Sequence, residues 1–247
     1  MDNTNYMVSI IIPAYNEARR LRSTILSISS YFNARHTAHE IIVVDDGSDD
    51  DTLQAIPAAR ELRATELHVL RHTKNAGKGF AVKRGMLAAR GDLLLFTDAD
   101  LSTPLDAYET LEQAIIQDGH DIAIGSRGLK ESRKIVAQGF FRDRMGKLFG
   151  RIVKHFLLKT ISDSQCGFKL FTKKSAQCVF SRQTIGGFGF DPEILYIAQQ
   201  NNFTIKEVPV VWTNNFDSKL HPVSDSIIVG CELATIKIKA LLGHYSM

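Results

Sequence analysis

The chain has 247 residues, of which 44% are hydrophobic and 23% are charged, and its formal net charge is +3. This length and hydrophobic content predict one globular domain, residues 1–247, with a sizeable core, and the small net charge gives no reason to expect nucleic acid as a partner. The three cysteines lack the spacing of metal ligands and are typical of a reducing compartment. The polar N-terminal residues differ from a signal peptide, and no stretch reaches about 18 uninterrupted apolar residues, so we expect neither a signal peptide nor a transmembrane segment.

Apolar segments typical of strands alternate with helical patterns over the first 127 residues. The predicted strands cover residues 8–12, 40–44, 67–70, 93–96 and 121–125. The predicted helices cover residues 17–32, 52–62 and 78–89, and a fourth begins at Thr103 with Pro104 in its first turn. We expect Pro13 to end the first strand. This order predicts an α/β fold, with a Rossmann-like, mainly parallel sheet and helices on both of its faces.

Two carboxylates follow the apolar run at residues 93–96, which is typical of a strand buried on both faces. Asp98 and Asp100 lie at the carboxyl end of this strand, where ligands bind in open α/β sheets. Carboxylates this close repel each other unless a cation lies between them, and oxygen ligands favour Mg²⁺ or Mn²⁺. The pattern therefore predicts a metal site, with a solvated pair of carboxylates in a turn as the alternative.

Further charged residues are expected at the same edge of the sheet. Asp45 and Asp46 follow the second predicted strand, and Lys78 lies between two glycines where a helix begins. Such a loop offers backbone N–H groups and an ammonium group to an anion, although alone it is also compatible with an ordinary glycine-rich turn. Acidic, basic and glycine residues at one edge together predict a site for a nucleotide and a metal.

The second half of the chain begins with a strongly basic segment. Residues 127–159 contain ten lysines and arginines against two carboxylates. From about residue 140 the pattern indicates an amphipathic helix with one basic face. Such a helix either seeks a membrane surface or packs on the domain with its basic face solvated. Arg142 falls on the apolar side of this helix and therefore needs a buried partner, such as a phosphate.

Shorter elements complete the chain. We expect a polar turn at residues 163–167 that leads into a short strand, helices at 174–180 and 192–201, a strand at 205–212 and a helix at 225–243. Asp191 is placed to cap the helix at 192–201. The last helix is mostly apolar, which favours packing on the domain over contact with a lipid surface.

Several short motifs, taken in order along the chain, resemble those of one enzyme family. They are Pro13-Ala14-Tyr15-Asn16-Glu17, Asp45-Asp46-Gly47-Ser48, Asn75-x-Gly77-Lys78-Gly79, Asp98-Ala99-Asp100, Gly125-Ser126-Arg127, Asp163-x-Gln165-Cys166-Gly167-Phe168-Lys169, Phe190-Asp191-x-Glu193 and Asp217-Ser218-Lys219-Leu220. Together they resemble the inverting family 2 glycosyltransferases of the GT-A fold, and the later ones resemble the dolichyl-phosphate hexosyltransferases. The chain has Asp-Ala-Asp-Leu-Ser-Thr-Pro where the mannose enzymes usually have Leu-Gln-His-Pro. This difference makes the chain more similar to the β-glucosyltransferases.

The resemblance implies a role for each matching residue. A Mg²⁺ or Mn²⁺ ion would be bound by Asp98 and Asp100. The mannose enzymes have a glutamine ligand at the position of Ser102, so a third protein ligand stays open. The nucleotide sugar would be bound by Pro13, Tyr15, Glu17, Asp45, Asp46, Lys78 and Asp98. The acceptor phosphate would be bound by Arg127, Arg142 and Lys219. The residues expected to act in catalysis are Asp98, Asp100, Arg127 and Asp191.

The implied reaction is the inverting transfer of a hexose, glucose from UDP-glucose, to a dolichyl or polyprenyl phosphate at a membrane surface. Residues 1–127 would form the nucleotide-binding part and residues 128–247 the acceptor part. The protein is expected to be cytoplasmic and peripheral on the inner face of a membrane. A phosphate acceptor is largely anionic at neutral pH and therefore needs positioning more than a general base.

Two alternative functions stay open. One is a family 2 enzyme that acts on a sugar hydroxyl, for which Asp191 or Glu193 would be the base. The other is a nucleotide-sugar-binding protein without turnover. The combination of a carboxylate pair with Lys78 and Arg127 argues against this second alternative.

Overall fold

The computed structural model describes residues 6–62, 64–135, 153, 157–213 and 222–245, and the side chains of Lys134 and residues 222–229 lie outside the description. A seven-stranded sheet forms the centre, with the order β3-β2-β1-β4-β7-β5-β8. Its strands are β1 Val8–Ala14, β2 His39–Asp45, β3 Glu66–Arg71, β4 Leu93–Thr97, β5 Ile122–Ser126, β7 Phe168–Thr172 and β8 Ile205–Pro209. A small second sheet pairs β6, Arg133–Lys134, with β9, Val211–Trp212.

The predicted mainly parallel α/β sheet is confirmed, with one antiparallel insertion. β1, β2, β3 and β4 pair in parallel, and so do β5 and β8. β7 comes from the second half of the chain and lies antiparallel between β4 and β5. It brings the residues around position 167 to the end of β4, which carries Asp98 and Asp100.

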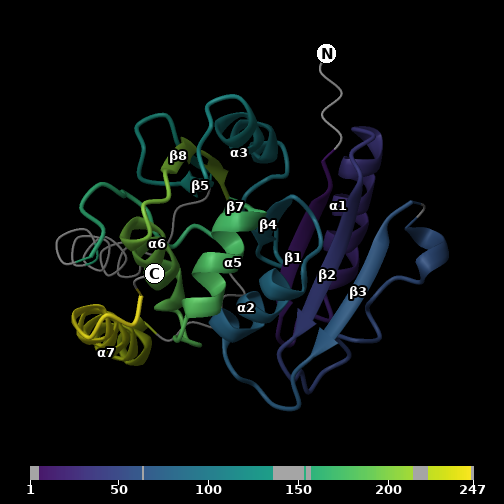
Figure 1. Cartoon of the computed structure of the whole chain (residues 1–247). Helices are drawn as coiled ribbons and strands as arrows, with labels where there is room; N and C mark the ends of the chain where they lie inside the picture. Colours follow the sequence, from purple (N-terminus) through teal and green to yellow (C-terminus); the bar gives the residue numbers. More distant parts are fainter. Residues whose placement is uncertain (1–5, 63, 136–152, 154–156, 214–221, 246–247) are drawn as a thin grey trace.

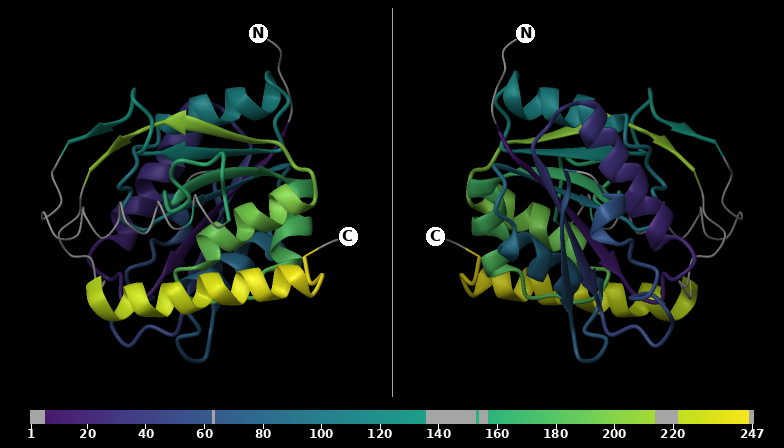
Figure 2. Two further views of the ribbon diagram at one scale, coloured as in Figure 1. Left: turned by 90° about the vertical axis from the view of Figure 1, so that its left-hand side faces the viewer. Right: turned by 90° about the vertical axis from the view of Figure 1, so that its right-hand side faces the viewer.

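Helices cover both faces of the sheet (Figures 1 and 2). They are α1 Leu21–Ala34, α2 Lys78–Ala88, α3 Ala107–Ile116, α5 Lys173–Arg182, α6 Phe190–Gln200 and α7 Pro222–Leu241. α1 and α3 share one core with Ile10 and Ile12, whereas α2, α5, α6 and α7 share the other with Ile11. The alternation along β1 thus separates the two cores, because successive side chains of a strand point to opposite faces.

Two predictions about prolines were wrong. Pro13 does not end β1, which pairs with β2 as far as Ala14. The pairing of β1 with β4 stops earlier, at Ile11, so the missing N–H of Pro13 costs no hydrogen bond on that side. Pro104 does not begin a helix, because a bend at Thr103 and a turn at residues 105–106 precede α3, which begins at Ala107.

The helix predicted at residues 52–62 was also wrong. The segment forms turns and one short 3-10 helix, Ala59–Glu61. The Asp50 carboxylate accepts hydrogen bonds from the backbone and hydroxyl of Thr52, which favours a local turn. Pro57 lies in the middle of the segment and would interrupt a helix there.

The predictions for the second half have mixed outcomes. The strand predicted at 205–212 is divided, because Pro209 ends β8 and β9 joins the other sheet. The last helix packs on the domain through Leu233 and Ile236, as predicted. The basic helix predicted from about residue 140, with Arg142, lies outside the described residues apart from the buried Val153, and Lys219 also lies outside them. Within the described ranges, no helix has both the length and the apolar character needed to cross a membrane.

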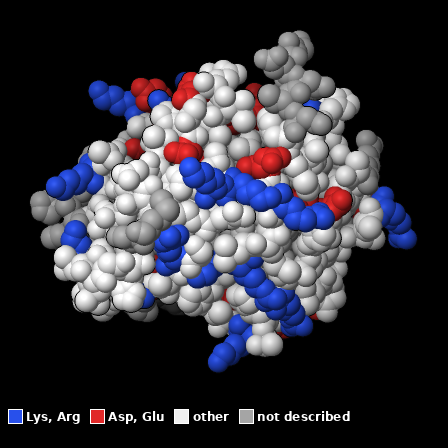
Figure 3. Space-filling view, viewed as in Figure 1, with Lys and Arg blue, Asp and Glu red and all other residues white. Residues whose placement is uncertain are grey.

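Lysine and arginine side chains form a band across the face that α2 and α5 cover (Figure 3). Some cations of these two helices bind carbonyl groups of the fold. Lys83 donates to the Gln183 carbonyl at 2.7 Å, Arg84 to the Arg71 carbonyl at 2.6 Å and Lys173 to the Arg90 carbonyl at 3.0 Å. These three cations therefore connect neighbouring segments of the fold.

Candidate active site

The carboxylates at the end of β4 form the centre of the site. Asp98 Oδ1 lies 2.6 Å from Lys78 Nζ, so the structure brings together two residues that the sequence assigned to the same edge. Asp100 Oδ1 accepts a hydrogen bond of 2.9 Å from the Ser102 backbone. The side chains of Asp98 and Asp100 are 33% and 23% exposed, so both remain accessible from solvent.

The surroundings of these carboxylates fit a divalent cation. Leu101 has φ +46°, a backbone conformation that a bulky residue rarely adopts and that is typical of functional sites. Gly167, immediately before β7, faces Asp98, and a Cβ there would overlap with the carboxylate. Aspartate oxygens are the ligands that Mg²⁺ and Mn²⁺ prefer. This donor chemistry agrees with the predicted metal role of Asp98 and Asp100, which stays a prediction.

Asp46 shapes the loop that precedes α2. Its carboxylate accepts hydrogen bonds from the backbones of Ala76 and Gly77, at 3.0 and 2.8 Å, and its Oδ1 lies 2.6 Å from His72 Nδ1. Gly77 has φ +100°, which permits the sharp turn into the helix at Lys78. These hydrogen bonds fix the conformation of the loop that leads to Lys78. The predicted contact of Asp46 with the nucleoside stays a prediction.

The loops after β1 and β2 are tied together at the same edge. The fully buried Asp45 accepts hydrogen bonds from Ser48, and the Ser48 hydroxyl in turn accepts one of 2.9 Å from the Asn16 backbone. Glu17 pairs with Arg20 at 2.6 Å. Pro13 lies near the end of β1 and Tyr15 just after it, so the structure places the predicted nucleoside-binding residues at the carboxyl ends of β1 and β2 and in the two loops that follow.

Arg127 follows β5 and binds Asp163 through two side-chain hydrogen bonds, of 2.6 and 2.8 Å. Its guanidinium also lies 5.4 Å from the centre of the Trp212 ring. Burial alone would raise the pKa of the Asp163 carboxyl, but Arg127 outweighs it and holds that pKa at about 2. Arg127 is therefore held by a carboxylate that occupies two of its N–H donors, and its predicted contact with a phosphate stays a prediction.

Sequence reasoning missed Lys169, the fully buried lysine of β7. Its Nζ pairs with Asp191 and donates to the Cys166 carbonyl at 2.6 Å. Burial raises the pKa of Asp191, and the ammonium groups of Lys169 and Lys78 partly offset that shift. Asp191 does not cap α6, since it lies inside the first turn and Gly189 occupies the cap position. The lone lysine in the apolar run Phe168–Phe171 is the signal that could have indicated a buried ion pair.

The two lysines form one charged network with the carboxylates of the site. The Nζ atoms of Lys78 and Lys169 lie 5.4 and 5.3 Å from the centre of the Phe96 ring. Lys78 pairs with Asp98, and Lys169 pairs with Asp191. The network combines a carboxylate pair suited to a metal with an ammonium group at a helix N-terminus, an arrangement that can bind a diphosphate.

Comparison with known proteins identifies the family. Residues 9–180 match the family model described as glycosyl transferase family 2. The chain belongs to this family. It is 38% identical over 257 residues to a dolichyl-phosphate beta-glucosyltransferase of Drosophila melanogaster, covering 99% of the chain and 78% of the relative. The enzyme of the same name from Homo sapiens is 34% identical, with coverage of 100% and 79%.

Solved structures confirm the GT-A fold of this family 2 member. A glucosyl-3-phosphoglycerate synthase of Mycobacterium tuberculosis superposes with a TM-score of 0.67 at 20% identity, covering 94% of the chain and 80% of that protein. The same enzyme in complex with Mn²⁺, UDP-glucose and phosphoglyceric acid has a TM-score of 0.67 at 18% identity, with coverage of 97% and 80%. At this identity the likeness concerns the fold.

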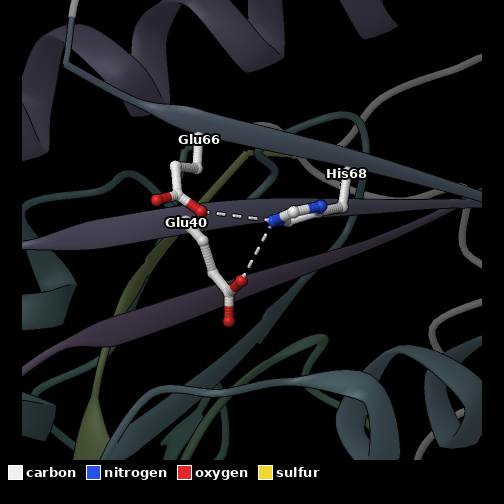
Figure 4. A group of neighbouring side chains, drawn as sticks. All are labelled: Glu40, Glu66 and His68. Atoms are coloured by element: carbon white, nitrogen blue, oxygen red, sulfur yellow. Dashed lines mark ion pairs between the residues drawn. The ribbon is translucent and has the colours of Figure 1, made fainter.

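A cluster of two glutamates and a histidine lies at the opposite end of the sheet. Glu40, Glu66 and His68 come from the first halves of β2 and β3 and are close enough to hold an ion (Figure 4). However, Arg90 already pairs with Glu40 at 2.9 Å and also with Glu66. In this family 2 chain the group is therefore an ion-pair cluster, remote from Asp98 and Asp100.

Proposed function

We propose that this family 2 glycosyltransferase transfers glucose from UDP-glucose, with inversion, to a dolichyl or polyprenyl phosphate at a membrane surface. The observation that carries the proposal is the similarity, over nearly the whole chain, to enzymes named for this transfer. The residues of the site support the same reaction, because a carboxylate pair, Lys78 and Arg127 suit a diphosphate donor and a phosphate acceptor. A Mg²⁺ or Mn²⁺ ion bound by Asp98 and Asp100 would neutralise charge on the leaving diphosphate.

The structure favours the phosphate acceptor over the sugar-hydroxyl alternative. A hydroxyl acceptor requires a base that can take its proton. Asp191, one predicted base, is 3% exposed and is already paired with Lys169. Glu193, the other, is fully buried and accepts hydrogen bonds from Thr184 and Ile185. A phosphate monoester arrives as an anion, so its transfer needs cations that bind and orient it more than it needs a base.

The proposal is tested by incubating labelled UDP-glucose and Mg²⁺ or Mn²⁺ with and without a short polyprenyl phosphate. We expect label in the organic extract only with the lipid phosphate, and its loss when EDTA is added. Parallel reactions with labelled GDP-mannose test the choice of sugar. UDP binding without organic label from either donor would support a hydroxyl acceptor, whereas binding without any product would support a nucleotide-sugar-binding protein.

The end of α7 supports the contact with a membrane. This helix runs along the side of the molecule at which β1, β2 and β3 end (Figures 1 and 2). Its last turn and the residue after it expose Ile238, Leu241 and Leu242, at 58%, 81% and 70%. Residues 230–245 also contain two lysines and a single carboxylate, Glu232, which binds the Gly189 backbone at 2.8 Å. An apolar and cationic surface of this kind suits anionic lipid.

Replacing both Leu241 and Leu242 by glutamine should reduce affinity for vesicles that contain anionic lipid by at least about tenfold, because each leucine loses apolar area buried in lipid. Co-sedimentation with vesicles measures this effect. Turnover of a short, water-soluble polyprenyl phosphate should be unchanged. The matched control is Ile116→Gln, which removes an exposed apolar side chain at the end of α3. Equal vesicle binding by the double variant and this control would contradict the assignment.

A further inference from the structure

Tyr245, which follows α7, is buried against the middle of the domain. Its side chain is 1% exposed, and its ring packs against that of Tyr196 at 6.2 Å between centres. The hydroxyl donates a hydrogen bond of 2.7 Å to Glu193 Oε1, and the carbonyl accepts one of 2.8 Å from Asn201 Nδ2. Burial raises the pKa of the Tyr245 hydroxyl, so it remains a donor at physiological pH.

Glu193 transmits this contact to a neighbouring loop. Its fully buried carboxylate accepts hydrogen bonds from the backbone and hydroxyl of Thr184, at 3.0 and 2.6 Å, and from the Ile185 backbone at 2.9 Å. Together with the Tyr245 hydroxyl, these donors surround the carboxylate. The start of the glycine-rich segment 184–189 is thereby attached to α6 and to the end of the chain.

The glycine-rich segment in turn supports the start of α2. The Gly186 carbonyl accepts a hydrogen bond of 2.7 Å from the backbone of Gly79, the residue after Lys78. The Gln183 side chain bridges the same two segments, donating to the carbonyls of Gly79 at 2.8 Å and Ile185 at 2.9 Å. A Cβ on Gly79 would lie 2.5 Å from the Ile185 carbonyl oxygen, so the two segments pack too closely for a larger residue at position 79.

A second contact from α7 holds the other end of the segment, because Glu232 accepts the hydrogen bond from the Gly189 backbone. From these contacts we infer that Tyr245 and Glu193 are positioning residues for donor binding, which hold the segment 184–189 so that Lys78 meets the donor diphosphate. The inference rests on the proposed function, in which Lys78 binds the diphosphate. It assigns the C-terminal part of the chain a role in the nucleotide half of the site.

Tyr245→Phe tests the inference, because it removes one hydroxyl and keeps the ring and the backbone contact with Asn201. We expect a five- to tenfold weaker affinity for UDP with Mn²⁺, measured by titration calorimetry. The KM for UDP-glucose should rise by the same factor, while the KM for the polyprenyl phosphate and kcat change less than twofold. Glu193→Gln should act in the same direction. The control Tyr196→Phe removes the hydroxyl of the adjacent ring and should leave UDP affinity at the wild-type value.

Two results would overturn the inference. One is wild-type UDP affinity in Tyr245→Phe, and the other is an equal rise in KM for donor and acceptor, which indicates a general loss of structure. Circular dichroism melting of each variant identifies a simple folding defect, and Tyr245→Phe is expected to remain folded at the assay temperature. UDP affinity is measured without turnover, so the inference can fail or succeed independently of transfer to a lipid phosphate.

Discussion

Asp100→Asn is expected to reduce transfer by about a thousandfold or more while the protein remains folded. The carboxylate lies at the end of β4 and is 23% exposed. Asparagine keeps an oxygen that can accept the hydrogen bond from the Ser102 backbone, so the local turn is preserved. What it removes is the negative charge that would help hold the metal and, through it, the leaving diphosphate. Loss of one preorganised electrostatic contact at a reaction centre typically costs 10²- to 10³-fold in rate, and a lost metal ion costs more.

The metal role of Asp100 has a readout that is independent of activity. Mn²⁺ binding to the purified protein, followed by electron paramagnetic resonance, should weaken in Asp100→Asn. It should be unchanged in Asp118→Asn, a matched change of an exposed carboxylate beyond α3. Retained transfer together with wild-type Mn²⁺ affinity in Asp100→Asn would place the metal elsewhere.

Lys169→Met is expected to reduce the free energy of unfolding at neutral pH by about 3–5 kcal/mol, because it leaves the Asp191 carboxylate buried without its partner. Equilibrium unfolding in urea measures the difference. Arg22→Met is the matched control, since it removes one partner of the more exposed Arg22–Glu61 pair and should cost no more than about 1 kcal/mol. Equal costs for the two variants would show that Asp191 does not depend on Lys169.

The same variant should show a characteristic dependence on pH. Burial already raises the pKa of Asp191, and removal of Lys169 takes away a group that lowers it. A carboxylate whose folded pKa lies above its unfolded value of about 3.9 is destabilising when ionised and costs nothing once protonated. The stability deficit of Lys169→Met relative to wild type should therefore be largest at neutral pH and shrink as the pH falls toward about 4.

Local sequence patterns predicted the parallel part of the fold well. Continuous apolar runs such as residues 93–96 indicate strands buried on both faces, and parallel strands place their carboxyl ends at one edge. The meeting of Lys78 with Asp98 follows from that geometry, and the structure confirms it at 2.6 Å. The helix predicted at residues 52–62 failed for a local reason, because turn-forming side chains and Pro57 outweighed the apolar spacing.

The sequence by itself determined the family, the α/β class of the fold, and the edge of the sheet at which Asp98, Asp100 and Lys78 lie. These features depend on short-range patterns and on the general geometry of parallel strands. Only the tertiary structure decided which charged and polar groups pair, as with Arg127 and Asp163, Lys169 and Asp191, or Tyr245 and Glu193. The partners in these pairs are 36, 22 and 52 residues apart. Such contacts depend on the antiparallel insertion of β7 and the packing of α6 and α7, which no local pattern specifies.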